Sequence, residues 1–147
     1  MRKIAIWIVI FSTFLSGCEI KKTYSPAQPE SNIAQIEIVN INRWFEYTPG
    51  SDYDFEVVCE ITEENYSAFL EGLRNVPCCS YYGSPYNGFM EDTIRITFSD
   101  GAFELVGEKS VYYETSEGEW TYPSYDLEQE AYKNFLSSWK AVYSYRG

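Results

Sequence analysis

The side chains that could do chemistry in this chain are carboxylates, tyrosines and cysteines, because the sequence contains no histidine. This absence excludes Ser-His-Asp and Cys-His catalysis and the common zinc sites. Paired carboxylates, as in glycoside hydrolysis, are the familiar catalytic set that remains. Glu104 has the most apolar setting, between Phe103 and Leu105, but strand alternation predicts that it faces solvent. We therefore predict no enzyme activity and no cofactor.

A group of three carboxylates, Asp52, Asp54 and Glu56, has a spacing that invites a calcium interpretation. A calcium loop needs a tight glycine turn and converging oxygens. Strand alternation instead places these three side chains in a line, about 7 Å apart. We therefore predict a solvated acidic strand face and no metal site.

Three cysteines, Cys59, Cys78 and Cys79, could form a disulfide in an exported protein. Three is an odd number, so one thiol is left over or pairs between chains. We expect Cys59 to pair with Cys78 or Cys79, closing a loop of about 20 residues and contributing about 3 kcal/mol. The alternative is three reduced thiols, with Cys59 as a small core residue. A bond between the neighbours Cys78 and Cys79 would be strained.

The N-terminus assigns a different chemistry to the first cysteine, Cys18. Two basic residues precede an apolar stretch, Ile4–Leu15, which has signal-peptide length and is too short to span a membrane. The stretch ends in Leu15-Ser16-Gly17-Cys18, which resembles the lipobox of bacterial lipoproteins. The resemblance covers residues 1–18 and implies cleavage before Cys18, attachment of a diacylglyceryl group to its sulfur and acylation of the new amino end. Two or more acyl chains give stable membrane anchoring.

The charge balance limits the partners of the exported chain. The 147 residues include 22 acidic and 11 basic side chains, a formal net charge of −11, and signal cleavage removes two of the basic ones. Nucleic acid and anionic lipid are poor partners for such a surface. A protein partner of this chain is expected to be basic on its contact face.

The chain divides into three parts. Residues 1–17 form the signal peptide, and residues 18–32 form the lipidated cysteine and a flexible linker rich in Lys, Ser, Pro and Gln. Residues 33–147 form one domain. We expect a first strand near Ile36–Ile41, with a change of phase at Val39-Asn40, and a second strand ending at Ile61.

Helical and hairpin signals follow in the second half. Tyr66, Phe69, Leu70 and Leu73 have the i, i+3, i+4, i+7 spacing of a helix packed on a sheet. Strands then follow around the turns Asp100-Gly101 and Glu117-Gly118, with Phe103 and Leu105 pointing inward. Asp126 and Gln129 have capping-box spacing before a final apolar helix. The predicted fold is α+β, an antiparallel sheet of about five strands with two helices packed on it, in the order ββαβββα.

One long segment, 77–91, is rich in aromatic and turn residues. Loops of this length are often functional or disordered. Its aromatic side chains, Tyr81, Tyr82, Tyr86 and Phe89, could contact sugar rings or a protein partner. The alternative is that these four side chains fold back and cover the sheet.

These observations predict a lipid-anchored protein of the cell envelope, facing the periplasm or the exterior. The anchor lies in the cell membrane or the outer membrane, and Glu19 after Cys18 favours the outer membrane in a cell that has one. The expected role is a non-catalytic binding module, of inhibitor or immunity type, that meets a basic protein. The alternative role is contact with carbohydrate or peptidoglycan through the aromatic loop.

Overall fold

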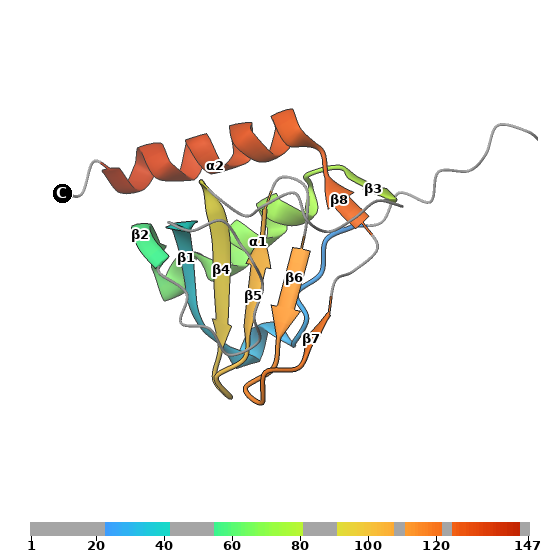
Figure 1. Cartoon of the computed structure of the whole chain (residues 1–147). Helices are drawn as coiled ribbons and strands as arrows, with labels where there is room; N and C mark the ends of the chain where they lie inside the picture. Colours follow the sequence, from blue (N-terminus) through green and yellow to red (C-terminus); the bar gives the residue numbers. More distant parts are fainter. Residues whose placement is uncertain (1–22, 42–54, 81–90, 108–110, 122–124, 145–147) are drawn as a thin grey trace, which may run out of the picture.

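The chain folds as α+β, with a large antiparallel sheet and two helices (Figure 1). The computed structural model describes residues 23–41, 55–80, 91–107, 111–121 and 125–144. In spatial order the large sheet contains β2 (Phe55–Ile61), β1 (Ile33–Ile41), β4 (Thr93–Phe98), β5 (Phe103–Val106), β6 (Val111–Glu114) and β7 (Trp120–Thr121). The helices are α1 (Tyr66–Arg74) and α2 (Gln129–Ser144), and single 3-10 turns form η1 (Glu30–Asn32) and η2 (Glu63–Asn65).

Two short strands make the element order more complex than predicted. β3 (Cys78–Ser80) pairs antiparallel with β8 (Tyr125–Leu127) and forms a separate two-stranded sheet. Strands of three residues are too short to show an alternating pattern, so the sequence did not reveal them. The α+β class and the antiparallel sheet are confirmed, but the large sheet has six described strands rather than five.

The last helix begins at a different cap from the predicted one. The Glu128 carboxylate accepts hydrogen bonds from the backbone N–H groups of Glu130 at 3.2 Å and Ala131 at 2.7 Å. These amides have no partner inside the first turn, so the carboxylate satisfies them. The prediction that Asp126 caps the helix is wrong, because Asp126 pairs with Cys79 within β8.

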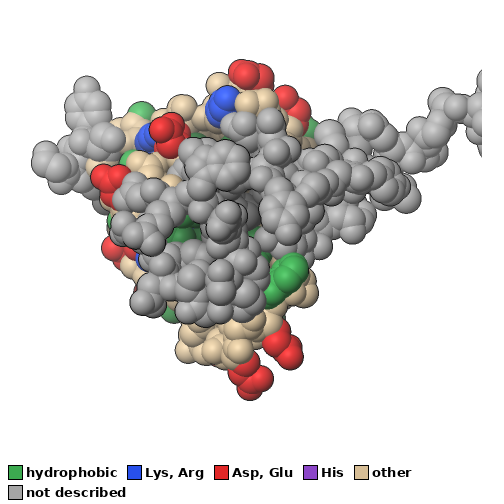
Figure 2. All heavy atoms as spheres, in the orientation of Figure 1, with side chains coloured by type: hydrophobic (Ala, Val, Ile, Leu, Met, Phe, Trp, Pro, Cys, Tyr) green, Lys and Arg blue, Asp and Glu red, His purple; other side chains and the backbone are tan. Residues whose placement is uncertain are grey.

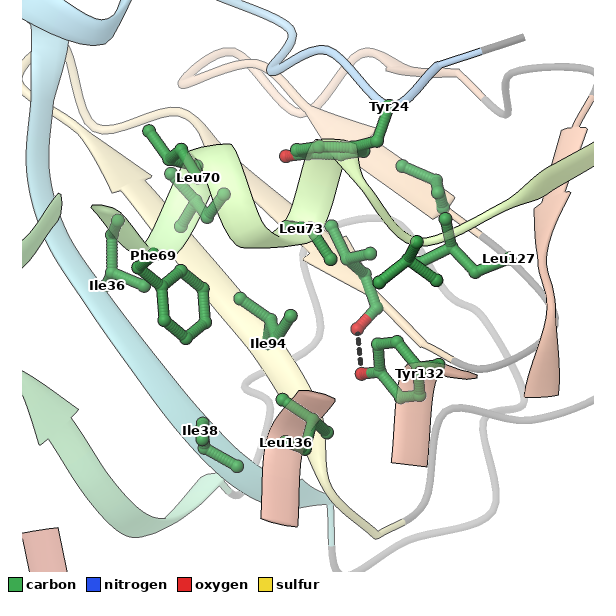
Figure 3. Close-up of a cluster of buried hydrophobic side chains, with 14 of the residues drawn as sticks. Tyr24, Ile36, Ile38, Phe69, Leu70, Leu73, Ile94, Leu127, Tyr132 and Leu136 are labelled. Carbon is green, nitrogen blue, oxygen red and sulfur yellow. Dashed lines mark hydrogen bonds between the residues drawn. The ribbon is translucent and has the colours of Figure 1, made fainter. Parts of the chain in front are cut away.

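The main core lies between the large sheet and the helices. In Figure 1, α1 lies behind the strands and α2 crosses one end of them. Figure 3 shows side chains from β1, β4, α1 and α2 converging in this layer. The fully buried set includes Ile36, Ile38, Ile94, Ile96, Phe69, Leu70 and Leu73. The predicted helical stripe of α1 is therefore the face that packs on the sheet.

The opposite face of the sheet carries a smaller cluster and a buried ion pair. The apolar members of this cluster are Val39, Ile41, Leu105 and Tyr112. Next to them, Glu37 accepts a hydrogen bond from Arg95 Nε at 2.8 Å and forms an ion pair with the Nη2 atom of the same guanidinium. Strand β1 is therefore covered on both faces, which explains why residues 36–39 are all buried.

The pairing of β1 with β2 is interrupted by a register shift between Ile38 and Val39. Ile38 pairs with Cys59 and Val39 pairs with Val57, so Val58 is an extra residue in β2. A bulge of this kind moves the side chains before it to the other face of the sheet. β1 itself keeps its alternation, with Ile38 in the main core and Val39 and Ile41 in the smaller cluster, so the apparent change of phase near Val39 reflects cover on both faces of the strand.

Helices α1 and α2 touch where a glycine permits close approach. A Cβ atom built on Gly72 would lie 2.8 Å from Cε2 of Phe135 in α2. The Phe135 ring packs against Phe69, with ring centroids 5.0 Å apart, and Phe69 also meets Trp139 at 5.1 Å. The glycine therefore lets one aromatic ring lie directly on the α1 backbone and join the two helices.

Candidate functional site

Glu104 is a buried carboxyl on the helix-covered side of the large sheet. It pairs with Ile96 of β4 and with Tyr113 of β6. Because paired residues of neighbouring strands share a face, Glu104 shares the face of Ile96, which belongs to the main core. Its exposed fraction is 2%. The prediction that Glu104 faces solvent is therefore wrong.

The error came from the phase of a short strand. We predicted that Phe103 and Leu105 point inward, and Leu105 is indeed fully buried. It is buried, however, in the smaller cluster on the opposite face of the sheet. Since both faces of β5 are covered, an apolar residue at one position does not expose its neighbour.

Glu104 is covered by the first described part of the chain, residues 23–32, which we call the N-terminal strap. The backbone N–H of Ala27 donates to Glu104 Oε2 at 2.9 Å. The Tyr24 hydroxyl lies beside the Glu104 carboxyl and lowers its pKa, and the Tyr24 side chain is 1% exposed. Figure 3 shows Tyr24 reaching from the strap into the main core.

The strap is tied to the sheet at further points along its length. The Gln28 side-chain amide donates to the Tyr113 hydroxyl at 3.1 Å and to Asp100 Oδ2 at 2.9 Å. Asn32 accepts a backbone hydrogen bond from Ser99 at 2.8 Å, and Glu30 forms an ion pair with Arg74 of α1. Packed structure is therefore already present at Tyr24, inside the predicted linker and before the predicted boundary at Ile33.

The environment of Glu104 favours its neutral form. Burial raises the pKa of the Glu104 carboxyl to about 7, although the hydrogen bond from Ala27 and the nearby Tyr24 hydroxyl lower it in part. Charge is disfavoured here because the surroundings are apolar and the donors are neutral. The group can therefore exchange a proton near neutral pH, but a side chain with this burial has no room for a substrate.

Sequence reasoning missed Tyr24, and it singled out Glu104 but placed it on the wrong face of the sheet. Tyr24 is an aromatic residue alone in a polar stretch, and its presence there was a signal that the stretch is anchored. Glu104 interrupts a four-residue strand in which Leu105 and Val106 are both apolar. Two adjacent apolar residues point to opposite faces of a strand, so this pair indicated that both faces of β5 are covered. The same pattern indicated that Glu104 is buried.

The predicted disulfide is not supported by the structure. Cys59 and Cys78 are free thiols. Cys59 lies on β2, whereas Cys78 and Cys79 lie on β3, and these strands are at opposite ends of the domain in Figure 1. The predicted pairing requires the chain after α1 to return to β2, whereas in the structure it continues to β3. Burial raises the pKa of the Cys59 thiol, and this effect outweighs the opposing effect of Lys140.

The remaining predicted site residues lie outside the described residues. These are the lipidation site Cys18 and the aromatic loop residues Tyr81, Tyr82, Tyr86 and Phe89. Asp52 and Asp54 of the acidic strand also lie outside, whereas Glu56 is exposed on β2. Within the described ranges, no group of three or more Cys, Asp or Glu side chains could hold a metal ion.

The edge strand β2 presents an apolar and acidic surface. Its two central valines, Val57 and Val58, are 48% and 41% exposed. They lie between the exposed carboxylates Glu56 and Glu60, and we call these four residues the β2 patch. Figure 2 shows carboxylates along the β2 side, on the left, and at the hairpin end, at the bottom.

The basic side chains of the described ranges do little to offset these carboxylates. Arg74, Arg95 and Lys140 each form an ion pair within the domain, with Glu30, Glu37 and Asp92 respectively. Lys133, on α2, is the fourth basic residue of these ranges. Carboxylates therefore outnumber basic side chains among the described residues.

Comparisons with known proteins identify no relative of this chain. Neither described helix is both long enough and apolar enough to cross a membrane. No family model matches the chain, no curated protein sequence matches it, and no solved structure matches its fold.

Proposed function

We propose that this protein is a lipid-anchored, non-catalytic binding module of the cell envelope that meets a basic protein, in the manner of an inhibitor or immunity protein. The β2 patch is the observation that carries the proposal. Val57 and Glu60 share one face of this edge strand, because they pair with Val39 and Glu37, so an exposed apolar side chain lies on the same face as a carboxylate. An apolar centre beside a polar rim is the anatomy of an interface. The negative charge of the carboxylates in the β2 patch favours a partner with a basic contact surface.

The form of β2 supports contact through side chains rather than through strand addition. β2 is the end strand of the large sheet, and end strands can pair with other chains. The extra residue Val58 and the flanking carboxylates are devices that discourage such pairing. They also push the two valines outward, which makes them available to a partner surface.

The case against catalysis rests on Glu104. It is the described carboxyl whose pKa is raised into the range useful for acid or base work. Its burial beneath the strap separates it from any solute. A buried proton-exchanging group without access to substrate supports a structural role, and therefore a binding protein rather than a hydrolase.

The partner is tested by capture with the full-length protein solubilised in mild detergent, followed by mass spectrometry of the bound envelope proteins. The double variant Glu56→Gln/Glu60→Gln is expected to lose most of the captured partner. The control Glu117→Gln/Glu119→Gln removes the same charge from the exposed β6–β7 turn and should retain it. Capture should also weaken as salt rises. An acidic partner, or capture that is insensitive to salt and to both variants, would contradict the proposal.

The anchor is tested separately through Cys18. The variant Cys18→Ser lacks the thiol to which the lipid would be attached, so it should lose lipid labelling and move from the membrane to the soluble fraction. Fractionation of cells and incorporation of labelled fatty acid measure both effects. Unchanged membrane partitioning of the variant would overturn the lipoprotein interpretation without affecting the test of the partner.

A further inference from the structure

We propose that the N-terminal strap is a latch that is closed while Glu104 is protonated and is released when Glu104 ionises. The observation is the juxtaposition of a buried carboxyl with a segment that has no regular secondary structure before residue 30. Opening of the latch would lengthen the free chain that connects the folded domain to the residues before the strap.

The strap is the weakest wall of the Glu104 site. Two other walls are the paired strands β4 and β6, which are held by backbone ladders on both sides of β5. The part of the strap over Glu104 is held instead by the Ala27 N–H, the Tyr24 ring and the Gln28 amide. Lifting residues 23–28 therefore exposes the carboxyl without breaking the sheet.

Ionisation supplies the driving force for release. A carboxylate without a cationic partner is poorly solvated inside the domain and is stabilised by water when the strap lifts. A protonated carboxyl has little to gain from water and still accepts the Ala27 N–H through its carbonyl oxygen. The two protonation states therefore favour different positions of the strap.

The other titratable or charged groups around the site are Tyr24 on the strap, Tyr113 on β6, Arg74 on α1 and Asp100 on the turn between β4 and β5. Asp100 has a pKa lowered by hydrogen bonds from Ala102 and Gln28, so it remains ionised near neutral pH. A response centred near pH 7 therefore reports on Glu104.

The consequence for the tether rests on the proposed lipid anchor. Residues 23–28 lie on the chain between Cys18 and the domain. At about 3.4 Å per extended residue, releasing these six residues adds roughly 20 Å to the reach of the domain from the bilayer. The latch itself depends only on the contacts of the strap.

Hydrogen exchange of the Ala27 amide measures the latch directly, because this N–H is the donor to Glu104. The full-length protein in detergent is compared between pH 5.5 and 8.5, with protection corrected for the intrinsic effect of pH. The unfolded reference pKa is 4.5 and the folded pKa is about 7. Opening should therefore increase about tenfold per pH unit up to pH 7 and level off above it.

Two variants test whether the pH response of the strap comes from Glu104. Glu104→Gln keeps the shape and cannot ionise, so its Ala27 protection should not change with pH. Asp100→Asn, which alters another carboxyl that contacts the strap, should keep the slope of the unmodified protein. If Glu104→Gln does not fold, Gln28→Ala serves instead. It should lower the protection at every pH and retain the slope.

Two results would overturn the proposal. One is Ala27 protection that does not change with pH in the unmodified protein. The other is Ala27 protection equal to that of core amides such as Ile96 at every pH, since the strap would then open only when the whole domain unfolds. Either result leaves the proposed anchor untouched, because the anchor is judged by fractionation of Cys18→Ser.

Discussion

Glu37 and Glu104 are two buried glutamates of the same sheet, held in opposite ways. Their exposed fractions are 3% and 2%, and they lie on opposite faces of the sheet. Glu37 faces the Arg95 guanidinium, which also lies 4.5 Å from the centre of the Phe55 ring. Among the described residues, Glu104 accepts a hydrogen bond from a neutral donor, the Ala27 N–H of the strap. Equal burial therefore produces a permanent ion pair in one case and a proton-exchanging group in the other.

The largest expected effect comes from removing the cation of the first site. Arg95→Ala leaves the Glu37 carboxylate buried without a partner, which is expected to lower the free energy of unfolding by about 3–5 kcal/mol. Urea denaturation of the full-length protein at pH 7 measures the change. The double variant Arg95→Ala/Glu37→Gln should recover part of the loss, and equal losses in the single and double variants would show that packing alone matters.

The second expected effect is the pH dependence that distinguishes Glu104. Because its folded pKa of about 7 lies above the reference value of 4.5, this group contributes full stability below about pH 4.5. That contribution is lost as the pH rises to about 7 and stays lost above it. At pH 8, Glu104→Gln removes the buried charge and should stabilise the domain by about 2–3 kcal/mol. Urea denaturation at pH 5.5 and 8 measures this, and a variant less stable than the unmodified protein at pH 8 would reject it.

The smallest expected effect comes from one hydroxyl of the second site. Tyr24→Phe removes the hydroxyl beside Glu104 and keeps the buried ring. The loss of this polar contact is expected to lower the free energy of unfolding by about 1 kcal/mol. The loss should be smaller at pH 8 than at pH 5.5, because ionisation of Glu104 releases the strap that carries Tyr24. Losses that are equal at the two pH values would count against this release.

The sequence predicted those elements whose signals are local. The apolar stripe of α1 is fully buried at Phe69, Leu70 and Leu73. The turns predicted at Asp100-Gly101 and Glu117-Gly118 contain glycines with φ of +88° and +83°, which glycine adopts without strain. Each of these signals depends on neighbours within a few residues, so tertiary contacts did not override them.

The sequence did not predict features that depend on distant partners. The face of Glu104 follows from pairing with Ile96 and from the cover over both sides of the sheet. Phe55, Val57 and Cys59 alternate in sequence, but the extra residue Val58 places Cys59 on the opposite face of the sheet from the other two. The strap is held in place by Tyr24, which packs into a core built from residues far along the chain. Single-sequence periodicity carries no information about such contacts.

The close approach of Gly72 to Phe135 also limits how this fold can vary over evolutionary time. A methyl group at position 72 would meet the Phe135 ring at 2.8 Å, and that ring is itself packed against Phe69 and Trp139. A larger residue at position 72 is therefore accommodated only when position 135 becomes smaller in the same lineage. Related sequences that share this fold should consequently change these two positions as a pair, which would link α1 and α2 in an alignment.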